Sequence, residues 1–309
     1  MLRTMLIAGT CLAMLTSVAP AKELKSVGLT LGSLGNPYFV ALTKGAEAKA
    51  KEINPNVKVV ATSADYDLNK QFSQIDNFIA AGVDLILLNA ADANAIFPAV
   101  KRAQQAGIVV VAVDVAAKGV DATVQTNNVQ AGEISCQYLA DKIGDKGNVI
   151  IENGPQVSAV VDRVKGCKEA LGKYPGIKIL SYDQDGKGSR DGGMNVMQGY
   201  LTRFPDIAGV FTINDPQAIG SGLAAAQLKH KDIVITSVDG APDMEVALKR
   251  DTSIVASASQ DPYGMAELAV SVGYDIMNGK KPADPMILMP SKLITRDNVS
   301  QYKGWSAPH

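Results

Sequence analysis

The chain has 309 residues and a formal net charge of −1, with 47% hydrophobic and 20% charged residues. This length is enough for two domains of ordinary size. The near-neutral charge, with lysines scattered along the chain, argues against a nucleic-acid partner, because such binding needs a basic face.

The first 21 residues have the features of a secretory signal peptide. Arg3 is followed by an apolar run over residues 5–15 and by small residues that end at Ala21. The apolar run is shorter than the roughly 20 residues that a transmembrane helix needs. Cys11 follows Thr10 rather than a small residue, which argues against a lipoprotein signal. We expect cleavage after about Ala21 and a periplasmic mature protein.

Short apolar runs alternate with amphipathic stretches in the first half of the chain, as in parallel βαβ units. Asn36 is expected to cap the first helix, with Pro37 at its first position. The predicted strands span residues 27–31, 57–61, 84–88 and 108–113, and the predicted helices span 37–52, 68–81 and 93–106.

The same alternation restarts after residues 124–128, which are expected to cross to a second unit. Helices are predicted at residues 131–143, 160–174, 192–204, 216–228 and 243–250, and strands at 148–151, 177–180, 207–212 and 233–238. Residues 254–259 are expected to form a second crossing, before a helix at 262–277 and a strand at 286–293.

The pattern predicts an α/β fold of two similar doubly wound parallel-sheet domains joined by a multi-strand hinge. The expected lobes comprise residues 22–127 with 259–289, and residues 128–258 with 290–309. Cys136 and Cys167 lie on predicted helices of the second lobe. An oxidising compartment favours a disulfide between them, although two buried thiols would give the same pattern.

The sequence lacks the usual signatures of enzymes and cofactor sites. His230 lies between two lysines and His309 is the last residue, and neither position suits a Ser-His-Asp arrangement. A nucleophile elbow, a phosphate-binding loop and a dinucleotide-binding glycine motif are all missing. Two cysteines without spaced histidines do not make a zinc site. We therefore expect no catalysis, no cofactor and no metal.

Polar side chains follow several predicted strands at the points where those strands end. They are Asn36, Asn89, Asp114, Asn214, Asp215 and Asp239. Carboxyl ends of strands border the ligand cleft in doubly wound folds, and Asp and Asn bind hydroxyl groups well. Each residue could instead cap a helix or form a turn. Together they predict a site for a hydroxyl-rich molecule.

Aromatic residues follow the first of these polar positions. Tyr38 and Phe39 can pack against the C–H faces of a sugar. Adjacent helical residues point about 100° apart, so one or both rings can reach the cleft. For Trp305, in the C-terminal tail, a cap on the hinge or on the domain surface is favoured.

These residues resemble the ribose-binding-protein family of periplasmic sugar receptors, with a type I periplasmic binding fold. The likeness covers nearly the whole mature chain in one order. It includes the segments 32–40 (GSLGNPYFV), 87–92 (LLNAAD), 193–198 (GMNVMQ), 211–215 (FTIND), 238–243 (VDGAPD) and 260–262 (QDP). Family members deliver pentoses, hexoses or polyols to a membrane ATP-driven permease, and sometimes to a chemoreceptor.

The resemblance implies a role for each matching position. Asn36 and Asp114 would bind hydroxyls from the first lobe, and Asn214 and Asp239 from the second. Tyr38 and Phe39 would flank the ligand, and Gln260 would contact it from the hinge.

The sequence departs from the ribose receptors at two arginine positions, which here are Val115 and Val161. Arg163 matches a further, more structural arginine of the same helix. The loss of two fork-shaped donors makes ribose itself doubtful. An open-chain alditol, a cyclitol or another pentose remains open, and Gln156 and Arg190 are candidate replacement donors.

The sequence therefore predicts a monomeric, exported receptor that closes around a small neutral sugar or polyol and delivers it to an ABC permease. The main alternative is a periplasmic signalling receptor for a sugar or an autoinducer-like ligand without a transport role. An enzyme acting on sugars and an amino-acid receptor are further alternatives. An amino-acid receptor would usually need an arginine or a helix N-terminus for the carboxylate.

Overall fold

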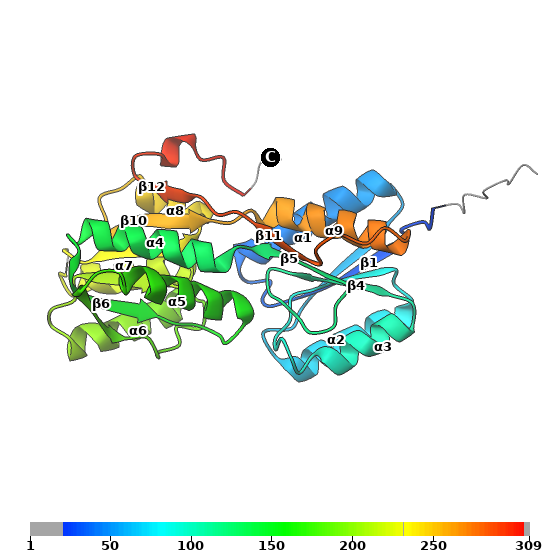
Figure 1. Ribbon diagram of the computed structural model, residues 1–309, viewed down its shortest axis with the longest axis horizontal. Coiled ribbons are helices and arrows are strands. Elements are labelled where there is room, and N and C mark those ends of the chain that lie inside the picture. The colour runs from blue at the N-terminus through cyan, green and yellow to red at the C-terminus, as the bar shows by residue number, and fades with distance from the viewer. Residues whose placement is uncertain (1–20, 231, 306–309) are drawn as a thin grey trace, which may run out of the picture.

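The computed structural model describes residues 21–230 and 232–305, so the expected signal segment lies outside the described residues except for Ala21. The chain forms two lobes side by side, each built around a six-stranded sheet (Figure 1). This arrangement confirms the predicted fold class of two doubly wound α/β domains. Among the described residues, no helix combines the length and the apolar character needed to cross a membrane.

The first lobe contains a sheet with the strand order β11-β5-β4-β3-β1-β2, in which all neighbours are parallel. Its elements are β1 (Ser26–Leu31), α1 (Pro37–Ile53), β2 (Lys58–Ser63), α2 (Leu68–Ala81), β3 (Leu85–Leu88), α3 (Phe97–Gln105), β4 (Val109–Val113), β5 (Ala122–Thr126), α9 (Pro262–Met277) and β11 (Met286–Met289).

The second lobe repeats this plan with the order β12-β10-β9-β8-β6-β7. Its elements are α4 (Asn128–Lys142), β6 (Lys146–Glu152), α5 (Ser158–Leu171), β7 (Gly176–Ser181), α6 (Arg190–Arg203), β8 (Gly209–Thr212), α7 (Asp215–Gln227), β9 (Val234–Asp239), α8 (Pro242–Leu248), β10 (Ile254–Ser259), β12 (Leu293–Thr295) and a 3₁₀ turn (Val299–Gln301). Among the described strands of this sheet, β12 at the edge is the one that pairs antiparallel to its neighbour.

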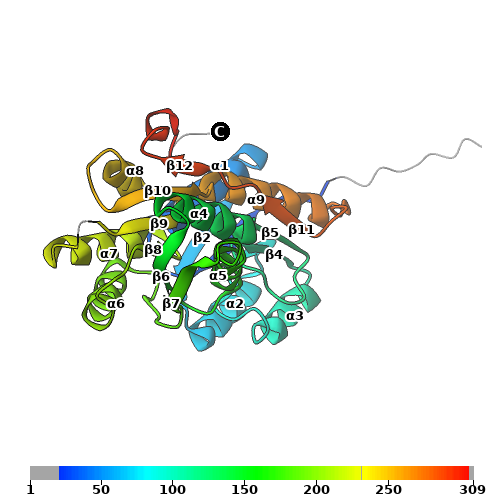
Figure 2. The same ribbon diagram turned by 60° about the vertical axis from the view of Figure 1, so that its left-hand side comes forward.

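Both faces of each sheet are covered by helices, because alternate residues of the central strands point to opposite sides. In β6, Val149 and Ile151 pack in the cluster that includes residues of α4 and α5, whereas Ile150 packs with residues of α6 and α7. Figure 2 shows these helix pairs on opposite sides of the sheet. In the first lobe, α1 and α9 cover one face and α2 and α3 cover the other.

The segment predicted as one strand over residues 286–293 is in fact divided between the lobes. Met286–Met289 pairs with β5 of the first sheet, and Leu293–Thr295 pairs with β10 of the second. Pro290 separates the two pieces and has no N–H to donate to a sheet. The residues 254–259, predicted as a crossing, form an interior strand of the second sheet, and the chain crosses after them.

The helix predicted from residue 93 begins at Phe97. The side chain of Asp92 accepts hydrogen bonds from the backbone N–H groups of Asn94 and Ala95, which forms a turn before the helix. Pro98 lies in the first helical turn, where a missing N–H costs little.

Helices α4 and α5 approach each other closely at two glycines. A Cβ atom added to Gly132 would lie 2.0 Å from the carbonyl oxygen of Arg163, and one added to Gly166 would lie 2.0 Å from that of Val129. Only glycine allows backbones to pack this tightly. The same helices are joined by a disulfide between Cys136 and Cys167, whose Cα atoms are 5.0 Å apart. The helix pair is therefore held both by packing and by a covalent bond.

Candidate functional site

The carboxyl ends of strands from both sheets border a cleft between the lobes. Its inner part is a cavity of about 50 Å³ to which both lobes and the hinge contribute. All seven residues predicted to contact ligand line this cavity: Asn36, Tyr38, Phe39, Asp114, Asn214, Asp239 and Gln260. The lobes touch nearby, since the N–H of Ala116 donates to Ser158 Oγ at 2.7 Å.

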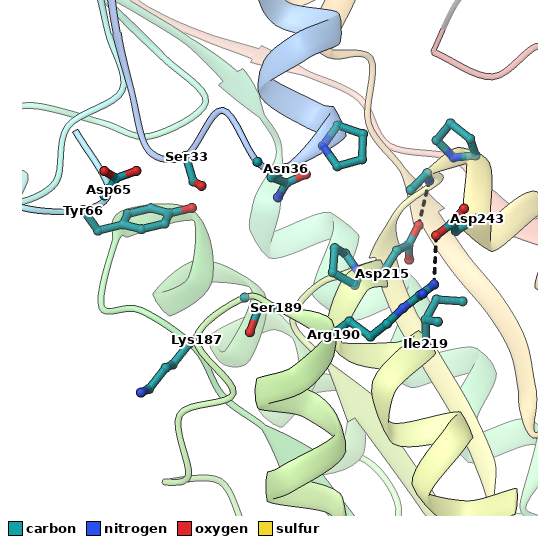
Figure 3. Close-up of a pocket in the computed structure, with 16 residues that line it drawn as sticks. Ser33, Asn36, Asp65, Tyr66, Lys187, Ser189, Arg190, Asp215, Ile219 and Asp243 are labelled. Carbon is teal, nitrogen blue, oxygen red and sulfur yellow. Dashed lines mark hydrogen bonds and ion pairs between the residues drawn. The ribbon is translucent and has the colours of Figure 1, made fainter. Parts of the chain in front are cut away.

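A larger outer cavity of about 800 Å³ lies next to the inner one (Figure 3). Ser33, Asp65 and Tyr66 of the first lobe lie on one side of it, and Lys187 and Ser189 of the second lobe lie on the other. The two cavities share Asn36, Tyr66 and Gly188 among their lining residues. The outer cavity is thus the entrance to the inner one.

Asp114 lies in a tight turn at the end of β4. Its backbone has φ of 67°, and the N–H of Val115 donates to the carbonyl oxygen of Val113 at 2.7 Å. Asn89 Nδ2 donates to the Asp114 carboxylate at 2.8 Å. The hydroxyl of Tyr38 lies 3.5 Å from Gln260 Oε1 and 3.5 Å from Met265 Sδ. Burial raises the pKa of Asp114, and the guanidinium of Arg163 opposes that rise. The unusual backbone aims the carboxylate at the cavity.

Asp239 occupies the matching place in the second lobe, as the last residue of β9. Its φ of 140° lies in a region that favours glycine. Its carbonyl oxygen accepts hydrogen bonds from the N–H of Gln260 at 2.8 Å and from the indole of Trp305 at 3.1 Å. These bonds hold the backbone in its strained conformation.

The carboxylate of Asp239 accepts hydrogen bonds from donors in both the second lobe and the hinge. It accepts hydrogen bonds from Gln260 Nε2 at 2.7 Å and from Arg163 Nη1 at 3.3 Å. Burial raises the pKa of Asp239 to about 6, and Arg163 opposes that rise. The ion pair is almost fully buried, so neither charge is free to be solvated by bulk water.

Arg163 contributes to the cavity wall, although the family resemblance implied a more structural role for it. Its Nε donates to Asn128 Oδ1 at 2.9 Å, and its Nη1 donates to the carbonyl oxygen of Ile213 at 2.8 Å. Val161, one of the two positions compared with arginines of ribose receptors, is about half exposed and is not among the lining residues. Val115, the other position, is buried and lines the cavity.

The strand-end asparagines Asn36 and Asn214 cap helices and also line the cavity. Asn36 Oδ1 accepts from the N–H of Tyr38, and Asn214 Oδ1 accepts from that of Gln217. Asp215 forms its hydrogen bonds within the second lobe. Its carboxylate accepts from the N–H of Ala241 and from Ser257 Oγ.

Both aromatic residues at the start of α1 reach the cavity. The rings of Tyr38 and Phe39 are edge-to-face, with centroids 5.4 Å apart. Trp305 packs edge-to-face on the other side of Tyr38 at 5.6 Å and is only 3% exposed. Trp305 therefore lies behind the cavity, where it supports Tyr38 and the backbone of Asp239.

Tyr66 lines both cavities but was not predicted as a site residue. It lies in the turn after β2, where no site residue was predicted. Both Asp65 and Tyr66 have positive φ in this turn, at 53° and 58°. Its ring lies over Gly32, where an added Cβ would be 2.8 Å from the ring. The two residues considered as substitutes for the missing arginine donors, Arg190 and Gln156, do not line the inner cavity. Arg190 pairs with Asp243 in the outer cavity, and Gln156 Nε2 donates to the carbonyl oxygen of Gly154.

A buried carboxylate, Glu152, lies behind the second-lobe wall. It accepts hydrogen bonds from Ser221 Oγ at 2.6 Å and from Gln217 Nε2 at 3.0 Å. The Oε1 of Gln217 in turn accepts from the N–H of Gly188, which lines both cavities. Burial raises the pKa of Glu152 from 4.5 to about 8.

We expect Glu152 to make stability depend on pH. Between pH 4.5 and 8 the folded protein holds a proton on Glu152 that the unfolded chain releases, so stability decreases as pH rises through this window. The contribution is on the order of a few kcal/mol. Glu152→Gln should flatten this dependence when the unfolding midpoint in urea is measured from pH 5 to 9. An unchanged slope would show that Glu152 is charged in the folded state.

The described residues give no sign of a metal centre, since no group of three or more His, Cys, Asp or Glu side chains in them could hold an ion. The charged groups that line the inner cavity are Asp114, Asp239 and Arg163. They come from opposite lobes. Carboxylates accept hydrogen bonds and a guanidinium donates them, which is the chemistry that hydroxyl groups require.

Residues 27–281 match the family model of the periplasmic binding protein domain. The chain therefore belongs to this family, which consists of substrate-binding proteins. It is 36% identical to the ribose import binding protein RbsB of Bacillus subtilis, over 88% of this chain and 87% of that protein. It is 32% identical to the xylitol-binding protein of Mycolicibacterium smegmatis, over 91% of this chain and 80% of that protein.

Solved structures of the same class share the fold. An ABC transporter solute binding protein from Mycobacterium smegmatis with bound glycerol superposes with a TM-score of 0.84 and 27% identity, over 91% of this chain and 98% of that one. A periplasmic solute binding protein from Actinobacillus succinogenes with bound D-allose gives 0.83 and 26%, over 90% and 100%. These relatives lend no support to the signalling alternative.

Proposed function

We propose that this protein is the periplasmic substrate-binding component of an ABC importer for a monosaccharide or a sugar alcohol, and that it catalyses no reaction. Relatives that import ribose or bind xylitol support this class of ligand. The lobes would comprise residues 22–127 with 259–289, and residues 128–258 with 290–309, after cleavage of the signal peptide near Ala21. The receptor would act as a monomer, so that its cleft opens freely.

One observation carries the proposal: Asp114 and Asp239 reach the same cavity from opposite lobes. A ligand can bind both carboxylates only when the lobes are closed, and this differential interaction shifts the population toward the closed form. Gln260 lies at the hinge and hydrogen-bonds to Asp239 and to Thr126 of the other sheet. Closure would present the surfaces of both lobes to a membrane permease.

A thermal-shift screen against pentoses, hexoses, alditols and inositols tests the proposal directly. A ligand at about 100 times its Kd should stabilise the folded protein by about 2.7 kcal/mol. Small-angle X-ray scattering of the protein should show a smaller radius of gyration in the presence of a compound found in the screen than in its absence. If no hydroxylated compound raises the unfolding temperature, the proposed function is wrong.

Transport and signalling are separated by a growth test. Deletion of the gene should abolish growth at low concentrations of the compound found in the screen. Restored growth on complementation would support import, whereas normal growth of the deletion strain would favour a receptor without a transport role.

A further inference from the structure

We propose that Tyr66 is a further ligand-binding residue, whose ring covers the guest at the junction between the inner and outer cavities and whose hydroxyl bonds to it. This rests on the proposed function and adds to its site a residue that was not among the predicted contacts. Three observations carry the proposal: the place of the ring, the free hydroxyl at its end, and the backbone conformation that holds it there.

The inner cavity is too small to enclose a sugar by itself. Its volume of about 50 Å³ corresponds to about four water-sized atoms, whereas a pentose has about ten non-hydrogen atoms. With the lobes as they stand, the rest of a guest must lie at the junction with the outer cavity. Asn36, Tyr66 and Gly188 line both cavities and so border this junction.

The second lobe presents only backbone through the residue that it contributes to both cavities, Gly188. Its N–H donates to Gln217 Oε1 at 2.7 Å, and its carbonyl oxygen accepts from Asn214 Nδ2 at 3.0 Å. The first lobe presents the ring of Tyr66 at the same junction. Aromatic rings pack well against the C–H faces of sugars. We therefore expect Tyr66 to supply the apolar cover that Gly188 cannot.

The hydroxyl end of the Tyr66 ring points inward. Its Cε1 and Cζ atoms would lie 2.8 Å from a Cβ atom added to Gly32, and Asn89 Oδ1 would lie 3.0 Å from the same point. Asn89 in turn donates to the carboxylate of Asp114. Figure 3 shows the ring extending from its turn into the cavity. The hydroxyl end therefore lies close to the carboxylate of the first lobe.

The hydroxyl of Tyr66 is available to a guest. Among the residues that the structure describes, it forms no hydrogen bond. Burial in the cleft and the carboxylates of Asp114 and Asp239 raise the pKa of Tyr66, so the phenol keeps its proton at neutral pH. A neutral phenol can both donate a hydrogen bond and accept one, as the hydroxyls of a sugar require.

The backbone at Tyr66 is unusual for an aromatic residue. The N–H of Asp67 donates to the carbonyl oxygen of Ala64 at 2.9 Å and closes a turn, in which Asp65 and Tyr66 both have positive φ. Such turns favour Gly, Asn and Asp at their centre. Lys70 Nζ holds the carboxylate of Asp65 at 2.5 Å. Strained residues of this kind cluster at ligand sites, so the ring, rather than the turn, accounts for the tyrosine.

Titration calorimetry of the full mature protein tests the proposal. D-ribose, D-allose, xylitol and myo-inositol represent the four classes of the screen, and the one that binds most tightly is the probe for every variant. Tyr66→Ala should weaken its binding at least about tenfold, and Tyr66→Phe, which keeps the ring, about three- to tenfold. Tyr182→Ala removes a half-exposed tyrosine that lines neither cavity and should bind as tightly as wild type.

Two further variants separate ligand binding from a structural role. Glycine adopts positive φ without strain, so Tyr66→Gly should unfold at a higher urea concentration than Tyr66→Ala and yet bind as weakly. Gly32→Ala keeps Tyr66 but places a methyl group where the ring lies, and it should also weaken binding. If Gly32→Ala does not fold, the Tyr66 variants decide the matter.

The loss of affinity should appear mainly as faster dissociation, because the ring covers a guest that has already bound. The single tryptophan, Trp305, packs against Tyr38 and provides the fluorescence signal for stopped-flow measurement. Wild-type affinity in folded Tyr66→Ala would overturn the inference and leave the proposed function standing. So would an affinity that follows the unfolding midpoint of the Ala and Gly variants instead of the presence of the ring. Binding of none of the four compounds by the wild-type protein would overturn both.

Discussion

Replacement of Asp239 by alanine is expected to weaken ligand binding by roughly a hundredfold. The carboxylate can accept charge-assisted hydrogen bonds from the guest, each worth about 1.5–3 kcal/mol, and each 1.4 kcal/mol is tenfold in affinity. The substitution also leaves the buried guanidinium of Arg163 without its ion-pair partner. Calorimetry with the compound found in the screen measures the loss.

A second variant and a control variant separate the effect of Asp239 on ligand affinity from its effect on the stability of the fold. Asp239→Ala should also destabilise the fold, because breaking a buried ion pair costs about 3–5 kcal/mol. Asp239→Asn keeps the size and one acceptor oxygen, and it should weaken binding with a smaller loss of stability. Asp251→Ala, which removes a fully exposed carboxylate of the same lobe, is the matched control and should bind normally. Wild-type affinity in folded Asp239→Ala would show that the site is misplaced.

Removal of the Cys136–Cys167 disulfide is expected to lower the free energy of unfolding by about 3 to 4 kcal/mol. The bond closes a loop with a sequence separation of 31, and the chain entropy that it removes from the unfolded state predicts this size. The double variant Cys136→Ala with Cys167→Ala is compared with wild type by urea unfolding. Affinity should stay close to wild type, because neither cysteine lines the cavity.

Reductant provides the control for this prediction. Dithiothreitol should lower the unfolding midpoint of wild type toward that of the double variant and should leave the double variant unchanged. Labelling with a thiol reagent, in unreduced protein that has been unfolded in urea to expose both positions, should find no free cysteine in the mature chain. Two reactive thiols, or a midpoint insensitive to reductant, would contradict the disulfide.

Much of the fold could be predicted because its signals are local. Buried parallel strands need continuous apolar runs, as in residues 108–113, and helices need caps, such as Asn36 before Pro37. Residues 286–293 were predicted as one strand, although the expected lobe boundary after residue 289 lay within them. Apolar character alone does not say which sheet a short strand joins, and only the pairing with β5 and β10 decides it.

The site was predicted to a similar extent and for a similar reason. Residues at strand ends and at the start of α1 could be named, since parallel strands bring their carboxyl ends to one edge. Arg163 and Trp305 were not assigned to the site. Their contacts with Asp239 join residues 76 and 66 positions apart, and nothing in the local pattern marks such pairs.

The sequence by itself determined the doubly wound class, the two-lobe plan and the polar residues at the cleft, because periodicity and strand ends are properties of neighbouring residues. Only the tertiary structure decided the character of the cavity. It placed Arg163 against Asp239, set Tyr38 and Phe39 at right angles, and lined the opposite wall with aliphatic side chains. The physical reason is that the walls of the cavity are built from side chains of both lobes. These side chains lie far apart in the chain and meet only in the folded protein.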